Sequence, residues 1–342
     1  MRVAEFSPAG VGATAYAGPS FRRVEQMDWE TFSERGERLG NRTRPLLVKG
    51  AITHWPATQH WTFERLAMLR RRDGSEVLTN FQIGIAEQGQ SRKDVIRPIA
   101  PYLLALAQAQ RSALAAGDDQ RGLLSAQRYA QLSCADSFRL DWSYMKTLPR
   151  DQPYISLWHI LKEFPDLRKD VHVAELWPGL RWDWAYTFLG PGKAVTGLHY
   201  DYPNNVFCQV SGVKEFLLFP PDQIGYMAPS AKYDWGGKMS HIDITRLDEQ
   251  PQQAQTFARA SGLYARVESG DALFVPRRTW HAVVSSVPSV SLAVFGLTPW
   301  EVLVDGAPSG VLALLHAMRL YGRGNCTCHG KTIPDTGHTA SF

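Results

Sequence analysis

The chain contains few cysteines, four among 342 residues. So small a number in a chain of this length does not make a disulfide framework, and we expect reduced thiols, as in the cytoplasm. No apolar run approaches the length of a membrane-spanning helix, and the first residues lack the charged start and apolar stretch of a signal peptide. The sequence therefore predicts a cytoplasmic protein with no membrane partner.

The chain also lacks a strong excess of one charge. Its 37 Lys and Arg and 33 Asp and Glu give a net charge of +4. Such mild basicity is compatible with a nucleic-acid partner but does not demand one. What the sequence does have is many aromatic residues, including 11 Trp. Most of these side chains are expected in the hydrophobic core.

The first 150 residues mix extended and helical patterns. Strands are predicted at 44–50 and 76–82, and helices at 29–39, 61–72 and within 102–132, with Thr62 available as a helix cap. We expect residues 1–150 to form an α/β lead-in that packs on the domain that follows.

From about residue 182 to residue 295 the chain consists of short β-rich runs separated by Gly, Pro and Asp. Ser211-Gly212 is expected to form a two-residue hairpin turn, and Trp182 and Trp184 to share one face of a strand in the core. Many short strands with tight turns predict a mainly β fold with flanking helices, a sandwich or a double-sheet barrel, over residues 151–300. The predicted strands are 184–189, 196–200, 205–210, 215–219, 264–267, 272–275, 281–285 and 290–295.

Two further segments differ from this pattern. Residues 221–262 are polar, rich in Gln and low in β propensity, so we expect an insert that lies over the mouth of the barrel. Residues 301–342 are expected to hold one amphipathic helix near 311–320 and then a flexible tail. The tail contains Cys326, Cys328 and His329, which resemble a metal-binding motif without a second ligand pair nearby.

Three side chains form the predicted metal site. His199 and Asp201 lie two residues apart on one predicted strand, so they share a face, with their Cα atoms roughly 6.6 Å apart. His281 begins a later strand, which a barrel can bring to the same interior position. Two imidazoles and one carboxylate leave up to three positions open on an octahedral ion, the arrangement of non-haem iron(II) oxygenases. Zinc hydrolases use the same ligand types, so these residues alone leave the metal open.

Two more polar residues lie close to the metal ligands in the predicted fold. Lys214 begins the run after Ser211-Gly212, and Thr196 precedes His199 on its strand. A five-carbon dicarboxylate that chelates iron needs a cation for its far carboxylate and a hydroxyl to complete the hydrogen bonding. We expect Lys214 and Thr196 to supply them.

These motifs resemble those of the cupin-like JmjC hydroxylases, the group that contains factor-inhibiting HIF. Residues 196–221 (TGLHYDYPNNVFCQVSGVKEFLLFPP) follow its central motif. Residues 270–276 (GDALFVP) with Trp280-His281 follow its distal-histidine motif, and residues 45–50 (PLLVKG) with Trp55-Pro56 and Trp61 match its usual lead-in. The resemblance implies a double-stranded β-helix, the jelly-roll or cupin core.

The resemblance also assigns roles to residues. It implies that His199, Asp201 and His281 bind Fe(II), and that Lys214 and Thr196 bind the far carboxylate of the co-substrate 2-oxoglutarate. Asn205 matches a polar position near the metal-bound end of that ligand. Tyr144 matches a tyrosine that also holds the far carboxylate, with a structural tyrosine as the alternative. Ala293 is a departure, since it stands about where some members place a polar residue near iron.

The resemblance implies a dioxygenase that uses 2-oxoglutarate and O₂, hydroxylates a protein or peptide residue, and releases succinate and CO₂. Hydroxylation of a small molecule or a tRNA nucleoside is the second hypothesis, and a non-catalytic metal-binding cupin module is the third. Related enzymes often dimerise through C-terminal helices, so a homodimer is an alternative to a monomer.

Overall fold

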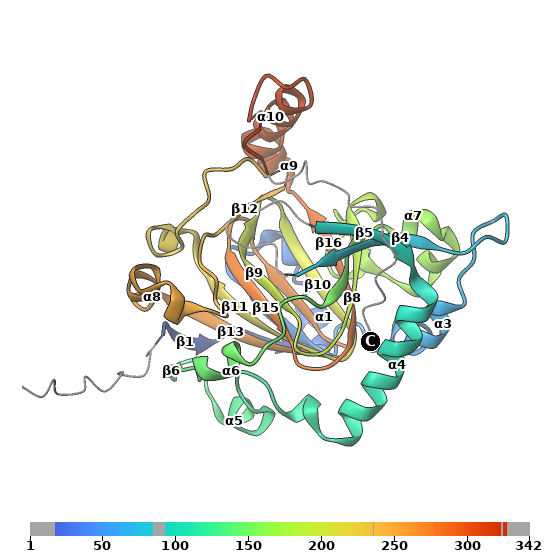
Figure 1. The fold of residues 1–342 in the computed structure, drawn as a ribbon, viewed down its shortest axis with the longest axis horizontal. Helices are drawn as coiled ribbons and strands as arrows, with labels where there is room; N and C mark the ends of the chain where they lie inside the picture. The colour runs from blue at the N-terminus through green and yellow to red at the C-terminus, as the bar shows by residue number, and fades with distance from the viewer. Residues whose placement is uncertain (1–17, 85–92, 235, 323, 327–342) are drawn as a thin grey trace, which may run out of the picture.

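Eight strands form two four-stranded sheets that face each other. The computed structural model describes residues 18–84, 93–234, 236–322 and 324–326. One sheet contains, in spatial order, β14 (Ala272–Val275), β10 (Asn204–Ser211), β16 (Ser289–Gly296) and β8 (Ala185–Gly190). The other contains β9 (Val195–Asp201), β15 (Trp280–Ser285), β11 (Val213–Phe219) and β13 (Ser261–Glu268). These eight strands are the eight predicted ones, and the expected jelly-roll core is confirmed (Figure 1).

Further strands widen both sheets. β12 (Gly237–Met239), β1 (Ser20–Arg23) and β6 (Phe138–Arg139) extend the sheet of β9 to seven strands. The sheet of β10 grows to nine by addition of β2 (Glu25–Asp28), β3 (Leu46–Lys49), β7 (Pro153–Trp158), β4 (Leu78–Ile83) and β5 (Lys93–Pro98). The predicted strands at 44–50 and 76–82 correspond to β3 and β4.

The turn at Ser211-Gly212 is not a hairpin, and that prediction is wrong. β10 pairs with β14 and β16, whereas β11 pairs with β13 and β15, so Gly212 joins strands of opposite sheets. Gly212 has a φ of 80°, and a Cβ there would lie 2.6 Å from the carbonyl oxygen of Pro288. Only glycine fits so sharp and so crowded a corner.

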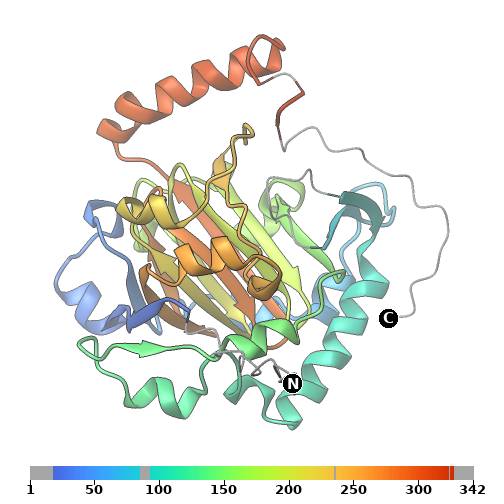
Figure 2. The same ribbon diagram turned by 60° about the vertical axis from the view of Figure 1, so that its left-hand side comes forward.

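The lead-in supplies helices that cover the outer faces of the sheets (Figures 1 and 2). The Thr62 hydroxyl caps α3 by accepting a hydrogen bond from the Arg65 backbone, as predicted. The lead-in helices are α1 (Trp29–Glu34), α2 (Ala57–His60), α3 (Phe63–Ala67), α4 (Ile99–Ala115), α5 (Ala126–Gln131) and α6 (Trp142–Lys146), and α7 (Ile160–Glu163) follows them before β8. Short 3-10 turns are η1 (Leu39–Asn41), η2 (Asp118–Gln120), η3 (Pro165–Asp170), η4 (Val173–Glu175) and η5 (Trp182–Trp184).

Trp182 and Trp184 lie in η5, not on a strand. Neither side chain is fully buried, and Trp184 is 40% exposed and lines a cavity. The predicted strand face is therefore wrong, and so is a core position for Trp184, whereas Trp182 packs against the core cluster as expected. Two aromatic residues separated by one position also occur in 3-10 turns, so the spacing of Trp182 and Trp184 does not by itself identify a strand.

The segment 221–262 contains more structure than its composition indicates. It includes η6 (Pro221–Tyr226), β12, η7 (Leu247–Glu249) and α8 (Pro251–Phe257). β12 pairs with β9, with Gly237 opposite Asp201 and Met239 opposite His199. This short strand was not predicted, and it places part of the segment beside the expected metal ligands.

The C-terminal helices stand away from the β core (Figure 2). They comprise α9 (Pro299–Glu301), the π-helical turn η8 (Val302–Gly306) and α10 (Ala307–Ala317). No helix within the described ranges is both long and apolar enough to cross a membrane. Cys328 and His329 lie outside the described residues, so the proposed tail motif stays a prediction.

Candidate metal centre

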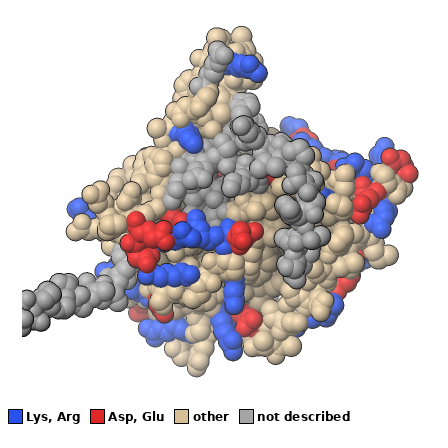
Figure 3. All heavy atoms as spheres, viewed as in Figure 1, with Lys and Arg blue, Asp and Glu red and all other residues tan. Residues whose placement is uncertain are grey.

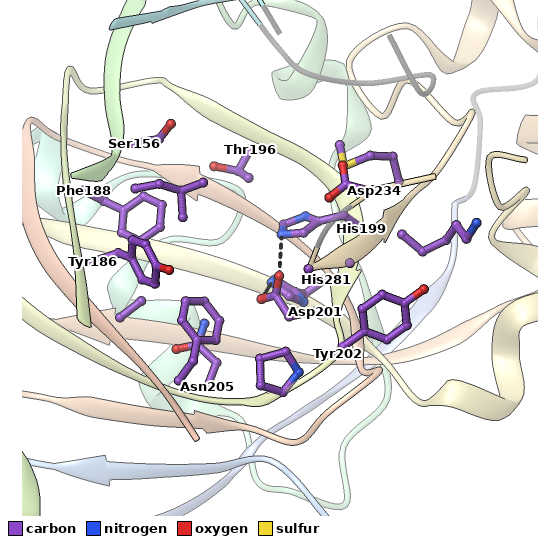
Figure 4. Close-up of a pocket in the computed structure, with 18 of the residues that line it drawn as sticks. Ser156, Tyr186, Phe188, Thr196, His199, Asp201, Tyr202, Asn205, Asp234 and His281 are labelled. Carbon is purple, nitrogen blue, oxygen red and sulfur yellow. Dashed lines mark ion pairs between the residues drawn. The ribbon is translucent and has the colours of Figure 1, made fainter. Parts of the chain in front are cut away.

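His199, Asp201 and His281 come together at one end of the barrel (Figure 4). His199 and Asp201 lie on β9, and His281 lies on the neighbouring β15, where its Cα is paired with that of His199. The ladder shifts register between His281 and Val283. This irregularity is typical of strands that aim a side chain into a site.

The three side chains converge at distances suited to one ion. One ligand atom from each lies within 4.8 Å of the others. Asp201 Oδ1 lies 4.0 Å from His199 Nε2, and Asp201 Oδ2 lies 3.7 Å from His281 Nε2. Two imidazoles and a carboxylate on one face fit iron(II) with open coordination positions.

Backbone contacts prepare both imidazoles to bind a metal through Nε2. His199 Nδ1 lies 2.7 Å from the carbonyl oxygen of Gly197, and His281 Nδ1 lies 2.9 Å from that of Thr279. A carbonyl accepts only, so each Nδ1 carries the proton and each Nε2 presents a lone pair that can bind a metal. Burial, with a further contribution from His199, lowers the pKa of His281 to about 4. His281 is therefore neutral at pH 7.

The turn that precedes β15 and His281 is hydrogen-bonded to β9, the strand that carries His199 and Asp201. Arg278 has a φ of 57°, and its backbone donates to the carbonyl oxygen of Asp201 at 2.8 Å. The backbone of Arg277 donates to Asn204 Oδ1 at 2.9 Å. Both guanidinium groups form ion pairs with Asp305. These arginines therefore tie the turn to η8.

A cavity of about 1000 Å³ opens beside the ligands and contains the predicted co-substrate residues. His199, Asp201, His281, Thr196, Lys214 and Asn205 all line it. Figure 4 shows the three ligands at its centre, Tyr186 and Phe188 to one side, and Tyr202 and Asp234 to the other. The volume is in the range of small-molecule and cofactor sites.

Lys214 is a buried lysine that lines this cavity. Its Nζ donates to the Tyr154 hydroxyl at 2.8 Å and lies 5.2 Å and 5.7 Å from the ring centres of Phe207 and Phe188. Burial lowers the pKa of Lys214 to about 7. Within the described ranges, no carboxylate forms an ion pair with it. A buried cation without an anion is costly, which fits a site for an anionic ligand.

Two other polar residues line the same cavity. Thr196 on β9 is paired with Val283 of β15, and Lys214 on β11 is paired with Ser285 of β15, so one strand separates the two. Asn205 Oδ1 is buried and has no hydrogen-bond partner among the described residues. Ala293 also lines the cavity, so it supplies no polar side chain there.

The expectation for Tyr144 is not met. Tyr144 lies on α6, packs against the apolar cluster of Phe257 and Trp280, and is not among the cavity-lining residues. The tyrosine beside Lys214 is instead Tyr154, ten positions later on β7. The available signal for this strand was its content of β-favouring residues, Tyr154, Ile155 and Trp158.

Comparisons with known proteins agree with the jelly-roll fold of this chain. A sequence model described as "Cupin-like domain" matches residues 33–296. The chain is 26% identical over 255 residues to "HSPB1-associated protein 1 homolog" of Danio rerio, which covers 73% of this chain and 51% of that protein. It is 25% identical over 260 residues to human "Bifunctional peptidase and (3S)-lysyl hydroxylase JMJD7", which covers 71% of this chain and 74% of that protein.

A third relative has a different kind of substrate in its name. The chain is 23% identical over 276 residues to human "tRNA wybutosine-synthesizing protein 5", which covers 80% of this chain and 76% of that protein. The chain thus spans about half of the zebrafish relative and about three quarters of the two human ones.

Proposed function

This chain belongs to the cupin-like domain family of JmjC-type proteins, and on that premise we propose that it is an iron(II)- and 2-oxoglutarate-dependent dioxygenase. The proposed reaction hydroxylates a residue of a protein or peptide and releases succinate and CO₂. One observation carries the proposal: the His199–Asp201–His281 cluster shares a cavity with the buried Lys214, which lacks an ion-pair partner among the described residues.

Each group in the cavity has a role in this proposal. His199, Asp201 and His281 hold iron(II), which supplies the redox chemistry with O₂. Lys214 and the Tyr154 hydroxyl bind the far carboxylate of 2-oxoglutarate, and Thr196 adds a hydrogen bond. Asn205 lies near the metal-bound end of the co-substrate. Phe188, Phe207 and Phe216 form apolar walls that exclude water from the reacting groups.

A protein or peptide substrate is favoured by two observations. The lysyl hydroxylase JMJD7 is named for hydroxylation of an amino-acid residue, and its similarity spans 71% of this chain. The cavity is also large, at about 1000 Å³, and its lining includes Lys238 of β12 and Leu312 of α10, from segments far apart in the sequence. A cavity of this size has room for a side chain of a peptide substrate.

A tRNA nucleoside is the second candidate substrate. It is favoured by the similarity to tRNA wybutosine-synthesizing protein 5, which spans 80% of the chain. The face in Figure 3 shows Lys and Arg intermixed with Asp and Glu, without a basic patch. A nucleic-acid interface needs concentrated positive charge, and the coloured residues on this face do not supply it.

The proposed function is tested by measuring succinate. Purified protein with iron(II), ascorbate, 2-oxoglutarate and O₂ is expected to form succinate slowly, and faster with a peptide library that contains its substrate. Mass spectrometry should then detect peptides heavier by one oxygen atom. Stimulation by tRNA instead of peptides would support the second candidate. Absence of succinate with every substrate class, from protein that has bound iron, would contradict the proposal.

Binding of 2-oxoglutarate is expected to weaken as pH rises above 7. Lys214 has a pKa of about 7 in the free protein and must carry a proton to pair with a carboxylate. Binding above this pKa therefore requires proton uptake, and affinity falls up to tenfold per pH unit. From pH 7 to pH 9 the dissociation constant should rise by about 50-fold. Calorimetry in buffers of different ionisation enthalpy would measure both affinity and proton uptake.

We also propose that the chain forms a homodimer through α9, η8 and α10. This segment stands off the core and carries exposed apolar side chains, with Trp300 at 68% and Leu314 at 61% exposure. So large an apolar surface is typical of an interface. Leu314→Glu is expected to halve the mass measured by light scattering. Leu104→Glu, at an exposed leucine of α4, should leave the mass unchanged. A dimeric mass for all three proteins would contradict this interface, and a monomeric mass for all three would contradict the dimer.

A further inference from the structure

A second group of metal-binding side chains lies outside the cavity. It comprises His54, in the turn after β3, with His172 and Glu175, which lie at the two ends of the η4 turn. One ligand atom from each lies within 4.8 Å of the others. None of the three lines the cavity, and all three side chains are about 40% exposed. The group is therefore independent of the proposed iron site and accessible from solvent.

The two imidazoles approach the same carboxylate from different sides. His54 Nε2 lies 2.7 Å from Glu175 Oε2, and His172 Nδ1 lies 3.1 Å from Glu175 Oε1. His172 and Glu175 are three residues apart in a helical turn, which places them on one face. His54 is 121 positions before Glu175, so only the fold brings it to this place.

The neighbouring side chains hold His54 and His172 in position. The Trp29 ring stacks on the His54 imidazole with centres 5.6 Å apart, and the His172 ring lies 6.4 Å from that of Trp55. Trp55 is fully buried. The imidazoles are therefore restricted in orientation before any ligand binds, which lowers the entropic cost of binding.

Two imidazole nitrogens and one carboxylate oxygen are a ligand set for zinc. Tetrahedral zinc with bonds of about 2.1 Å separates its ligand atoms by roughly 3.4 Å, so small side-chain rotations suffice here. Three protein ligands leave one position for water. Imidazole-rich sites bind Zn²⁺, Ni²⁺ and Cu²⁺ more tightly than Fe²⁺. The same order applies to the two imidazoles and the carboxylate of the proposed iron site, so zinc held there has to be subtracted in a test of this group.

We propose that His54, His172 and Glu175 form a surface site for a divalent transition metal, with zinc as its occupant. The bound ion would fasten the turn after β3 to η4. The turn after β3 is also hydrogen-bonded to the turn between β13 and β14, because the backbone of Ile52 donates to the carbonyl oxygen of Gly270 at 2.8 Å. A metal that binds only the folded chain raises stability through ligand linkage.

The site is tested by a difference in zinc stoichiometry. Metal-free full-length protein is dialysed against Zn²⁺, and bound zinc is measured by elemental analysis. His172→Ala is expected to bind one zinc ion fewer per chain than the parent. His60→Ala is the matched control, because His60 is equally exposed and contacts Asp170 outside the group. Zinc held by His199 or by the tail is present in all three proteins and cancels in the difference.

Two further measurements distinguish the loss of a zinc ligand from a folding defect in the His172→Ala protein. Glu175→Gln keeps the size of the side chain and should weaken zinc binding by at least about tenfold, given the loss of a charged ligand. Zinc should raise the Tm of the parent and of His60→Ala more than that of His172→Ala or Glu175→Gln. Equal stoichiometry and equal thermal shifts in all four proteins would overturn the proposal, leaving an ion-paired histidine cluster.

Discussion

Replacing Lys214 with methionine is expected to weaken 2-oxoglutarate binding at least about 100-fold and to raise the free energy of unfolding at pH 7 by roughly 2 kcal/mol. The first effect follows from the loss of the cation that receives the far carboxylate. Truncating one partner of a buried charge pair usually costs ~2–5 kcal/mol of binding energy, because the other charge stays buried without a partner.

The gain in stability has a separate cause. Burial lowers the pKa of Lys214 from 10.5 to about 7, so the unfolded chain binds this proton more tightly. That difference corresponds to ~4–5 kcal/mol against the folded state, and loss of the partner of the Tyr154 hydroxyl offsets ~1–3 kcal/mol. The penalty is fully present below about pH 7 and fades as pH rises toward 10.5, where the unfolded lysine also loses its proton. The advantage of methionine should therefore vanish near pH 10.

Denaturant unfolding at pH 7 and pH 10, with calorimetric titration of 2-oxoglutarate, measures both effects. Lys162→Met is the matched control, because Lys162 is an exposed lysine of α7 and should change neither quantity. Unchanged 2-oxoglutarate affinity in Lys214→Met would mean that the cavity does not receive the dicarboxylate in the proposed way. The non-catalytic metal-binding module would then be the better interpretation.

The β core and the shared strand face of His199 and Asp201 were predictable because their signals are local. The eight strands are short runs of apolar and β-branched residues with turn residues between them, and all eight appear in the structure. His199 and Asp201 share a strand face by their spacing alone. His281 required the jelly-roll topology, which places β15 beside β9.

The missed features depend on contacts between distant segments. A run that bends at Gly212 from one sheet into the other has the same local pattern as a hairpin, so only the strand partners distinguish them. Tyr154 is brought to Lys214 because β7 joins β8 at the edge of its sheet. The His54–His172–Glu175 group has no sequence motif, since 121 positions separate its most distant members.

Replacing Asp201 with alanine is expected to reduce succinate formation by roughly 1000-fold or more, the largest effect among the cavity residues. Asp201 supplies the only carboxylate of the three-residue ligand group, and loss of several kcal/mol of metal-linked stabilisation corresponds to about this factor. Iron content after dialysis should fall together with activity, because two neutral imidazoles hold Fe²⁺ weakly. The hydrogen bond from the Arg278 backbone to the Asp201 carbonyl does not involve the Asp201 side chain, so the turn before His281 should keep its position.

Asp234→Ala is the matched control, since this carboxylate lines the same cavity outside the ligand group and its loss should leave bound iron unchanged. If Asp201→Ala retains iron and turnover while Asp234→Ala loses them, the ligand assignment is wrong, and the metal lies at the side of the cavity formed by β12.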